Sequence, residues 1–318
     1  MDSSYVVGID VGGQTTKLGV VDARGTVLAQ TVIRTDTHSE VELYIAELAD
    51  AINKVIKDAD AEGKIRGIGV GAPNGNYYTG TIENAPNLPW GRTTVEFAKL
   101  LSKAMKGIPV ALTNDANAAA VGEMTYGAAR GMKNFIMITL GTGVGSGIVI
   151  NGEVVYGHDG FAGELGHVAA VRNNGRACNC GKSGCLEAYA SATGVARTAR
   201  EWLELTDEPS VLRSLDTIAS KDVYEAAKDG DKLALKIFEF TGKILGRSFA
   251  DFIAFSAPEA IVLFGGLARA KEFLTEPIEE AMNANVLPLW KNKVKLIYSQ
   301  LKESDAAILG ASALGWEL

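Results

Sequence analysis

The chain has 318 residues, of which 47% are hydrophobic and 22% are charged, and its formal net charge at pH 7 is −7. This length predicts two domains, since a single domain usually holds roughly 100–200 residues. The acidic balance argues against a nucleic-acid partner, and the absence of a long apolar run argues against a membrane span.

The N-terminal residues and the cysteines indicate the cellular compartment of the protein. Residues 1–4 lack the basic and apolar stretches of a signal peptide. An odd number of cysteines without an export signal is typical of a reducing compartment. We therefore expect a cytoplasmic protein.

The first half of the chain begins with a predicted glycine-rich hairpin. A strand over residues 5–9 leads into a turn that ends at Lys17, and a second strand covers residues 18–21. Such a turn can point several backbone N–H groups outward together, which favours anionic oxygens, and Lys17 adds a positive charge. Apolar residues at three- and four-residue steps then predict a helix over residues 41–56, and a β-type run follows over residues 65–70.

The second half repeats this pattern. A strand over residues 135–140 leads into a glycine turn over residues 141–147 and a return strand over residues 148–150. One glycine-rich hairpin is weak evidence, but two that open half-chains of similar size predict a duplicated α/β domain. A third glycine turn, at Gly265 and Gly266, could cover a nucleotide base. Phosphate-binding turns in both halves therefore predict a nucleotide held between two domains.

A candidate catalytic carboxylate lies at a strand-to-helix junction. A short strand over residues 110–112 runs into Asn114 and Asp115, and a helix follows directly. Asp115 could accept a proton from an attacking hydroxyl group while Asn114 hydrogen-bonds a neighbouring one. The structural alternative is that Asp115 or Asn117 caps the helix, where such residues are favoured. Local spacing leaves both interpretations open.

The cysteines form the most specific feature of the sequence. All three lie within eight positions, as Cys178, Cys180 and Cys185, and His167 lies just upstream. Three thiolates and an imidazole are the four ligands that a closed tetrahedral zinc site requires. A disulfide or plain burial is the alternative, but clustered cysteines in an intracellular chain favour a metal.

Five short motifs, taken together, resemble one known family. They are DVGG at residues 10–13, NDAN at 114–117, LGTGVG at 140–145, GELGH at 163–167 and CNCGKSGCLE at 178–187. Over essentially the whole chain these residues resemble the ROK sugar kinases. The resemblance implies a two-domain α/β fold of the actin/hexokinase-like (ribonuclease H-like) ATPase type, with a cleft between the domains.

The expected domains follow from this architecture. We expect a small first domain over residues 1–112, with a C-terminal helix within about 301–318 packing back on it. The larger second domain would cover residues 113–300 and carry the zinc loop. The resemblance also implies a homodimer or a larger homo-oligomer.

The resemblance implies roles for individual residues. Asp115 would be the general base, and the sugar hydroxyls would be held by Asn87, Asn114, Glu164, His167 and Glu187. Asp10 would face a magnesium ion, and the phosphates of ATP would be held by Gly12, Gly13, Gln14, Thr15, Lys17, Gly141, Thr142 and Gly143. One structural zinc ion would be bound by His167, Cys178, Cys180 and Cys185.

The first turn departs from the family pattern. The family usually places threonine after the two glycines, and this chain has Gln14 there. Glutamine offers an amide donor on a longer arm instead of a hydroxyl group. We expect phosphate binding to persist through the backbone and Thr15.

The implied reaction is ATP-dependent phosphorylation of a hexose, with glucose to glucose 6-phosphate as the default. A kinase for N-acetylmannosamine, N-acetylglucosamine or fructose would share nearly all of these residues. A sugar-sensing regulator of the same family is an alternative of another class. We expect no DNA-binding domain here, because the first strand begins at Tyr5. Removing zinc is expected to weaken sugar binding more than ATP binding.

Overall fold

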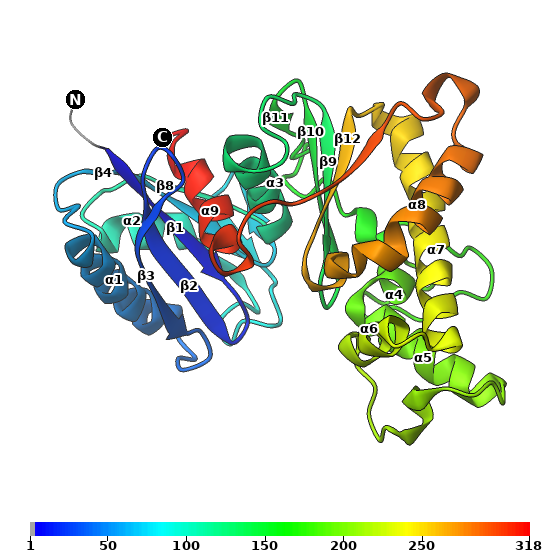
Figure 1. The fold of residues 1–318 in the computed structure, drawn as a ribbon. Helices are drawn as coiled ribbons and strands as arrows, with labels where there is room; N and C mark the ends of the chain where they lie inside the picture. The colour runs from blue at the N-terminus through cyan, green and yellow to red at the C-terminus, as the bar shows by residue number, and fades with distance from the viewer. Residues whose placement is uncertain (1–3) are drawn as a thin grey trace. The chain divides into compact units, whose positions relative to one another are not determined.

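A computed structural model describes residues 4–318 (Figure 1), with the side chains of residues 303 and 304 left out. Residues 1–3, on which the signal-peptide argument partly rests, lie outside the described residues. The chain forms two compact units. Unit 1 comprises the residues up to Met132, Gly147–Gly163 and Gln300–Leu318, and unit 2 comprises Lys133–Ser146 and Glu164–Ser299.

Unit 1 is built on a mixed sheet of five strands in the order β3-β2-β1-β4-β8. The pairs β1–β2 and β2–β3 are antiparallel, whereas β4 lies parallel to β1 and to β8. The strands are β1 (Tyr5–Val11), β2 (Thr15–Val21), β3 (Val27–Arg34), β4 (Ile65–Gly71) and β8 (Val110–Thr113). The predicted strands at 5–9, 18–21, 65–70 and 110–112 are therefore confirmed.

Helices cover both faces of this sheet (Figure 1). Alternate residues of a strand point to opposite faces, so Val7 belongs to a core cluster with α1 (Val41–Asp58), and Val6 belongs to one with α9 (Glu303–Gly315). The predicted helix over residues 41–56 is confirmed by α1. Because β1 is covered on both faces, its residues form a nearly continuous apolar run.

Glycines let α9 lie very close to the sheet. A Cβ atom on Gly69 of β4 would lie 1.8 Å from the carbonyl oxygen of Ala311, and one on Gly8 of β1 would lie 2.1 Å from that of Ile308. No other residue type fits at such a distance. The C-terminal helix is thus packed directly onto the central strands of unit 1.

The boundary of unit 1 differs from the expected end near residue 112. The helix α3 (Asp115–Tyr126) belongs to unit 1, because it packs against α9 where Gly122 meets Gly310. A Cβ atom on Gly122 would lie 2.6 Å from the Cα atom of Gly310. Two glycines far apart in the sequence create this contact, and the sequence near residue 112 does not predict it.

The remaining elements of unit 1 are short. They are β5 (Gly75–Asn76), β6 (Thr81–Glu83), β7 (Thr94–Val95), α2 (Phe97–Ala104) and β11 (Glu153–Val154). The Asn76 amide donates to the carbonyl of Asp159 at 2.8 Å, and the rings of Tyr77 and Tyr156 stack 4.1 Å apart. These contacts join the segment Gly147–Gly163 to the loops after β4.

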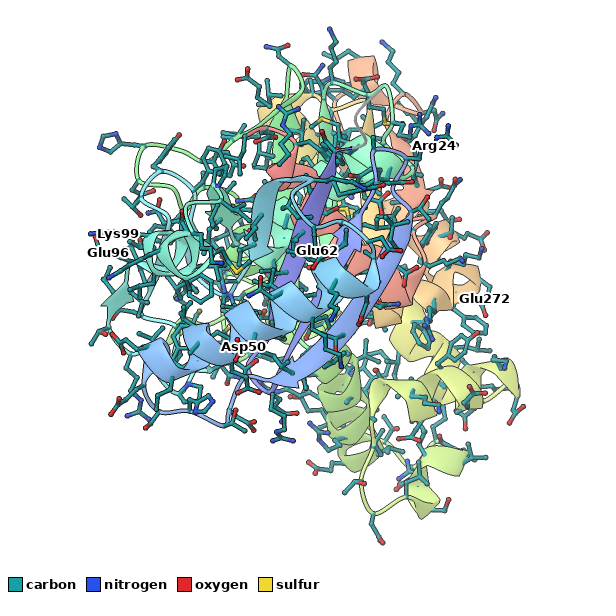
Figure 2. All side chains as sticks on the ribbon, turned by 90° about the vertical axis from the view of Figure 1, so that its left-hand side faces the viewer. Arg24, Asp50, Glu62, Glu96, Lys99 and Glu272 are labelled. Atoms are coloured by element: carbon teal, nitrogen blue, oxygen red, sulfur yellow. The ribbon has the colours of Figure 1, made fainter. Side chains whose placement is uncertain are left out.

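The surface of unit 1 is rich in charged side chains, as expected from the composition. Figure 2 shows Arg24, Asp50 and Glu62 pointing into solvent. Glu96 and Lys99, at the start of α2, form an exposed ion pair at 2.8 Å. Exposed pairs of this kind contribute little to stability.

The second sheet has the strand order β11-β10-β9-β12-β13. The strand β12 lies parallel to β9 and to β13. Its strands within unit 2 are β9 (Phe135–Leu140), β12 (Ala260–Phe264) and β13 (Lys295–Tyr298), and β10 (Val144–Ile150) runs from unit 2 into unit 1. The predicted strand at 135–140 is confirmed.

The strand β10 begins earlier than expected, which shortens the glycine turn to residues 141–143. Val144, Ser146 and Gly147 are buried within the strand. Gly147 serves close packing instead of a turn, because a Cβ atom there would lie 2.8 Å from that of Ala120. The glycine-rich sequence thus predicts a turn at Gly145 and Gly147, but both glycines belong to the strand β10.

Unit 2 is completed by helices. They are α4 (Glu187–Ala190), α5 (Ala192–Leu205), α6 (Ser220–Lys228), α7 (Lys232–Ser256) and α8 (Lys271–Asn285), with short 3₁₀ turns at Leu165–His167, Val211–Ser214, Gly266–Ala270 and Pro288–Trp290. The helices α7 and α8 lie side by side (Figure 1) and meet where Gly246 approaches Ile278. Within the described residues, no helix is both long and apolar enough to cross a bilayer.

Candidate functional site

The turn between β1 and β2 has a rigid backbone. The N–H of Gly12 donates to the carbonyl of Thr15 at 3.0 Å, and Asp10 lies opposite Lys17 across the two strands. The hydroxyl of buried Thr16 contacts those of Thr35 and Tyr44 at 2.8 and 2.6 Å. Thr16 therefore holds the turn from inside, whereas the exposed Thr15 can present its hydroxyl to a ligand.

Asn87 lies against this turn. A Cβ atom on Gly13 would lie 3.0 Å from the carbonyl oxygen of Asn87 and 3.3 Å from its Cβ atom. Gly13 therefore permits the close approach of the loop that carries Asn87, whose side chain is exposed. Unit 1 thus brings together Asn87 and the phosphate-binding turn expected from the sequence.

Asn114 and Asp115 lie where β8 passes into α3. The side-chain oxygen of Asn114 accepts the N–H of Asn117 at 2.7 Å, so Asn114 is the N-cap. The capping alternative named Asp115 or Asn117, but Asp115 is the first helical residue and Asn117 is the donor. Asp115 is exposed, and one of its oxygens lies 2.9 Å from the N–H of Ala116.

Two carboxyl groups of the candidate site in unit 1, those of Asp10 and Asp115, have raised pKa values. Burial, and then the charge of Asp115, raise the pKa of the half-buried Asp10 to about 6, against the opposing effect of Lys17. Desolvation by the surrounding protein also raises the pKa of Asp115, although the residue as a whole is exposed and hydrogen bonds from backbone N–H groups oppose the shift. A carboxylate with a raised pKa is a stronger base, which is the property that proton abstraction needs.

In unit 2 the turn over residues 141–143 is held by the chain that follows the cysteines. The N–H of Ala192 donates to the carbonyl of Gly141, and the hydroxyl of Thr193 donates to that of Thr142, each at 2.8 Å. The N–H of Val144 donates to a carboxylate oxygen of Glu187 at 2.9 Å. The turn is preorganised, while the side chain of Thr142 remains exposed.

The third glycine turn borders a cavity of about 270 Å³ within unit 2. Gly265 has φ +104°, and a Cβ atom there would lie 2.6 Å from the carbonyl oxygen of Leu140, whereas the space beside Gly266 is open. The cavity is lined by Ser220, Lys221, Tyr224, Glu225, Gly266, Leu267, Arg269 and Ala270. The lining thus comes from the 3₁₀ turn Gly266–Ala270 and from α6, which contributes the aromatic ring of Tyr224.

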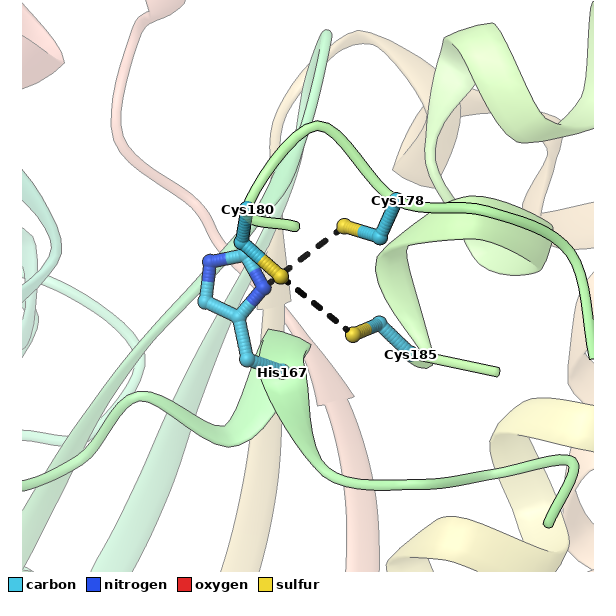
Figure 3. A group of neighbouring side chains, drawn as sticks. All are labelled: His167, Cys178, Cys180 and Cys185. Carbon is cyan, nitrogen blue, oxygen red and sulfur yellow. Dashed lines mark hydrogen bonds between the residues drawn. The ribbon is translucent and has the colours of Figure 1, made fainter. Parts of the chain in front are cut away.

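The three cysteines and His167 come together in unit 2, as Figure 3 shows. One ligand atom of each of the four residues lies within 4.8 Å of the others. The Sγ atoms of Cys180 and Cys185 are 3.6 Å apart, and Sγ of Cys178 lies 3.8 Å from Nδ1 of His167. All three thiols are free, so the disulfide alternative does not describe this arrangement.

These spacings fit a zinc ion. With bonds of about 2.3 Å, two thiolates in a tetrahedral site lie about 3.8 Å apart. The loop is closed by the N–H of Cys178, which donates to the carbonyl of Lys182 at 2.8 Å, and the ammonium group of Lys182 reaches the carbonyl of His167 at 2.8 Å. The donor set and its geometry therefore suit the closed Cys₃His site that the cysteine pattern predicts.

The two nitrogens of His167 point to different neighbours. Nδ1 faces the cysteine sulfurs, whereas Nε2 lies 4.0 Å from a carboxylate oxygen of Glu164. The side chain of Glu164 is 56% exposed, and its loop is held by the N–H of Leu165, which donates to Ser146 at 3.0 Å. A ligand hydroxyl group could therefore meet Nε2 and Glu164 together while Nδ1 serves a metal.

Glu187 has a structural contact that the sequence did not reveal. One oxygen accepts the N–H of Val144, and the other lies 3.7 Å from the sulfur of Cys178. This carboxylate lies directly against Gly143, where a Cβ atom would be 2.2 Å from an oxygen of Glu187. Glu187 thus joins the glycine turn to the cysteine loop.

The sequence reasoning also missed Thr193, whose role follows only from the position of α5.

Comparison with known proteins identifies relatives over the full length. A sequence profile of the ROK family matches residues 6–317. A glucokinase of Halalkalibacterium halodurans is 37% identical over 321 residues, which cover 99% of this chain and 95% of that protein.

Solved structures are similar over the same span. The crystal structure of a ROK hexokinase from Thermus thermophilus has a TM-score of 0.83 and 30% identity, covering 98% of each chain. A ROK family glucokinase from Streptomyces griseus, in complex with glucose and AMPPNP, has a TM-score of 0.79 and 31% identity, covering 99% of this chain and 100% of that one. The predicted α/β fold of the actin/hexokinase-like type is confirmed.

Proposed function

Because the chain belongs to the ROK family, we propose that it transfers the γ-phosphoryl group of ATP to a hexose, and that glucose is the hexose, giving glucose 6-phosphate. The observation that carries the proposal is Asp115, a solvent-accessible carboxylate with a raised pKa on the first turn of α3. Whole-length similarity to a glucokinase that binds glucose and AMPPNP supports the substrates.

The proposed role of Asp115 is that of general base. Its carboxylate accepts the proton of the sugar hydroxyl group as that oxygen forms a bond to the γ-phosphorus and the bond to the β-phosphate oxygen breaks, releasing ADP. Asn114, fixed as the cap of the same helix, is placed to hydrogen-bond a neighbouring hydroxyl group. Because α3 packs tightly on α9, both side chains stand on a rigid element.

The magnesium ion that accompanies ATP is assigned to Asp10. Carboxylate oxygens are common magnesium ligands in proteins, and an ion bound there would neutralise charge on the phosphates. Asp10 lies at the end of β1, beside the turn whose backbone and Thr15 would hold phosphate oxygens together with Lys17. Gln14 is exposed and offers its amide in place of the family's threonine.

Unit 2 supplies the other nucleotide contacts in this proposal. Thr142 and the backbone of residues 141–143 would hold phosphates, and the adenine would lie in the cavity beside Gly266. The ring of Tyr224 and the open space beside Gly266 suit a planar base, and Lys221 supplies a cation near it.

The sugar hydroxyls are assigned to Asn87, Asn114, Glu164, His167 and Glu187. His167 is proposed to ligate zinc through Nδ1 and to meet a hydroxyl group through Nε2, which already points toward Glu164. A zinc ion held by His167, Cys178, Cys180 and Cys185 would have all four positions filled by protein and would act as a structural brace.

An assay of ADP release with glucose, N-acetylmannosamine, N-acetylglucosamine and fructose tests the reaction and its substrate. We expect the highest kcat/KM with glucose. If the highest kcat/KM is found with an N-acetylated sugar or with fructose, that sugar is the substrate in place of glucose. If none of the four sugars stimulates ADP release, the kinase proposal is refuted. We also propose that the protein acts in the cytoplasm and forms a homodimer or a larger homo-oligomer. Light scattering on the full chain tests the oligomeric state.

A further inference from the structure

A buried arginine stands directly before the cysteine loop. The side chain of Arg176 is only 9% exposed, which is unusual for a charged residue. Its Nη1 donates to the hydroxyl of Thr198 at 2.9 Å and to the carbonyl of Ala188 at 3.2 Å. The ring of Tyr189 lies 4.5 Å below the guanidinium group, and the Tyr189 hydroxyl accepts the backbone N–H of Arg176 at 2.7 Å.

The carboxylate of Glu201 binds Arg176 and also a second arginine, Arg197. Both Nε and Nη2 of Arg176 donate to one oxygen of Glu201, on the third turn of α5. The other oxygen of Glu201 accepts Nε of Arg197 at 2.7 Å, and Nη1 of Arg197 reaches the carbonyl of Ala177 at 3.1 Å. Glu201 thus fixes the guanidinium groups of Arg176 and Arg197. Through these two groups it holds the main chain at Arg176 and at Ala177.

These two residues set the shape of the whole cysteine loop. Ala177 is followed directly by Cys178 and pairs with Ser183 across the loop. The carbonyl of Arg176 accepts the N–H of Gly184 at 2.8 Å, and Gly184 directly precedes Cys185. Holding Arg176 and Ala177 in place therefore fixes the positions at which Cys178 and Cys185 leave the loop.

We infer that Glu201 is a positioning residue for the zinc centre, acting through Arg176 and Arg197 to keep Cys178 and Cys185 in the geometry that retains the metal. The inference rests on the proposed zinc site. Replacing a residue that hydrogen-bonds a metal ligand changes metal affinity by about 10- to 100-fold, and we take the lower end of this range for Glu201, which acts through the two arginines. Glu201 touches neither substrate nor metal, so its effect passes entirely through the loop.

The test compares Glu201→Gln with Glu204→Gln, a matched loss of charge at an exposed position on the same helix. Zinc release from the purified, zinc-loaded protein to a chromophoric chelator is followed at a fixed temperature. We expect Glu201→Gln to release zinc at least about 10-fold faster than wild type. Arg176→Lys, which keeps the charge and loses the planar fork, should also release zinc faster, and Glu204→Gln should match wild type.

A second measurement separates positioning from simple helix–loop packing. Thermal unfolding is recorded for each variant with excess zinc and after zinc removal. A positioning role predicts that Glu201→Gln lowers the Tm of the zinc-loaded protein more than that of the zinc-free protein. Equal losses of Tm in both states, with zinc released at the wild-type rate, would overturn the inference.

The zinc content of the wild type distinguishes this inference from the proposal beneath it. About one zinc ion per chain, with unchanged release from Glu201→Gln, would refute the role of Glu201 and leave the zinc site intact. Wild-type protein that binds no zinc in metal analysis would refute both.

Discussion

The carboxylate of Glu187 accepts the backbone N–H of Val144 at 2.9 Å, so a residue expected to bind sugar also holds the glycine turn expected to bind phosphate. The same side chain lies 3.7 Å from the sulfur of Cys178. Three features that the sequence presents separately are therefore physically connected within unit 2. A change in the cysteine loop should for this reason affect the glycine turn as well.

Glu187→Ala should impair both substrates, and Glu187→Gln should be milder. Alanine leaves the N–H of Val144 without its partner and loosens the turn, which costs about 1–3 kcal/mol for an unsatisfied buried group. Glutamine can still accept that hydrogen bond but lacks the charge. Steady-state kinetics should give a higher KM for both ATP and glucose with alanine, and mainly for glucose with glutamine. An unchanged KM for ATP in Glu187→Ala would contradict the link to the turn.

Asp115→Asn should abolish phosphoryl transfer while leaving the fold and sugar binding nearly intact. Removing a general base typically lowers the rate by about 10²- to 10⁴-fold. Asparagine preserves the shape of the side chain, and the helix keeps its cap at Asn114. Turnover is measured by ADP release, glucose affinity by calorimetry and folding by Tm. Near-normal turnover in this variant would show that another group accepts the proton.

Asp10 gives a prediction about stability and pH. Its pKa is raised from 3.8 to about 6 in the folded protein, so folding favours the protonated carboxyl group. The stabilising effect of that proton is present below the unfolded pKa and is lost as the pH rises through about 6. By linkage the loss amounts to at most about 3 kcal/mol, less the effect of solvent screening.

Asp10→Asn removes the ionisable carboxyl group, and with it the loss of folding stability above about pH 6. We expect the variant, without ligands, to have a higher Tm than wild type at pH 7.5 and a much smaller difference in Tm at pH 4.5, while losing magnesium-dependent activity. Asp50→Asn, at an exposed position on α1, is the matched control and should change neither quantity. If Asp10→Asn lowers the Tm at pH 7.5, the charged carboxylate is stabilised rather than strained.

The motifs identified from the sequence lie where their chemistry requires a defined backbone, which is why they were recognisable. Asp10 is the next-to-last residue of β1, Asn114 caps α3, and the cysteine loop is closed by the Ala177–Ser183 bridge; such positions admit few residue types. The partners that hold them come from distant parts of the chain. Arg176 and Glu201 are ordinary charged residues in the sequence, and their pairing depends on how α5 packs.

The error at the second glycine turn has a similar cause. Gly145 and Gly147 were assigned to a turn, because glycine usually marks one. Gly147 is instead a strand residue selected for its lack of a Cβ atom against Ala120. Packing between segments that are remote in sequence cannot be deduced from local composition.

Removing zinc should weaken sugar binding strongly and nucleotide binding to a smaller extent. His167 would lose its orientation directly, since Nδ1 is the proposed ligand atom and Nε2 faces Glu164. The glycine turn would be affected only through Glu187, because Ala192 and Thr193 still hold it. Calorimetry with glucose and with AMPPNP, before and after chelation, measures both affinities. Cys180→Ser should reproduce the effect, and equal losses for the two ligands would contradict the ordering.

The packing of α9 on the sheet predicts an unusually severe glycine substitution. A Cβ atom on Gly69 would lie 1.8 Å from the carbonyl oxygen of Ala311, and a backbone atom cannot rotate away. Gly69→Ala should therefore destabilise the protein by more than the 1–3 kcal/mol typical of about one extra buried carbon. The matched control is Gly63→Ala, where φ is +71° and no atom lies within 4 Å, so only backbone strain of about 1 kcal/mol is expected. Chemical denaturation should give a much lower free energy of unfolding for Gly69→Ala than for Gly63→Ala. Similar values for the two variants would show that α9 can move away from β4 at little cost.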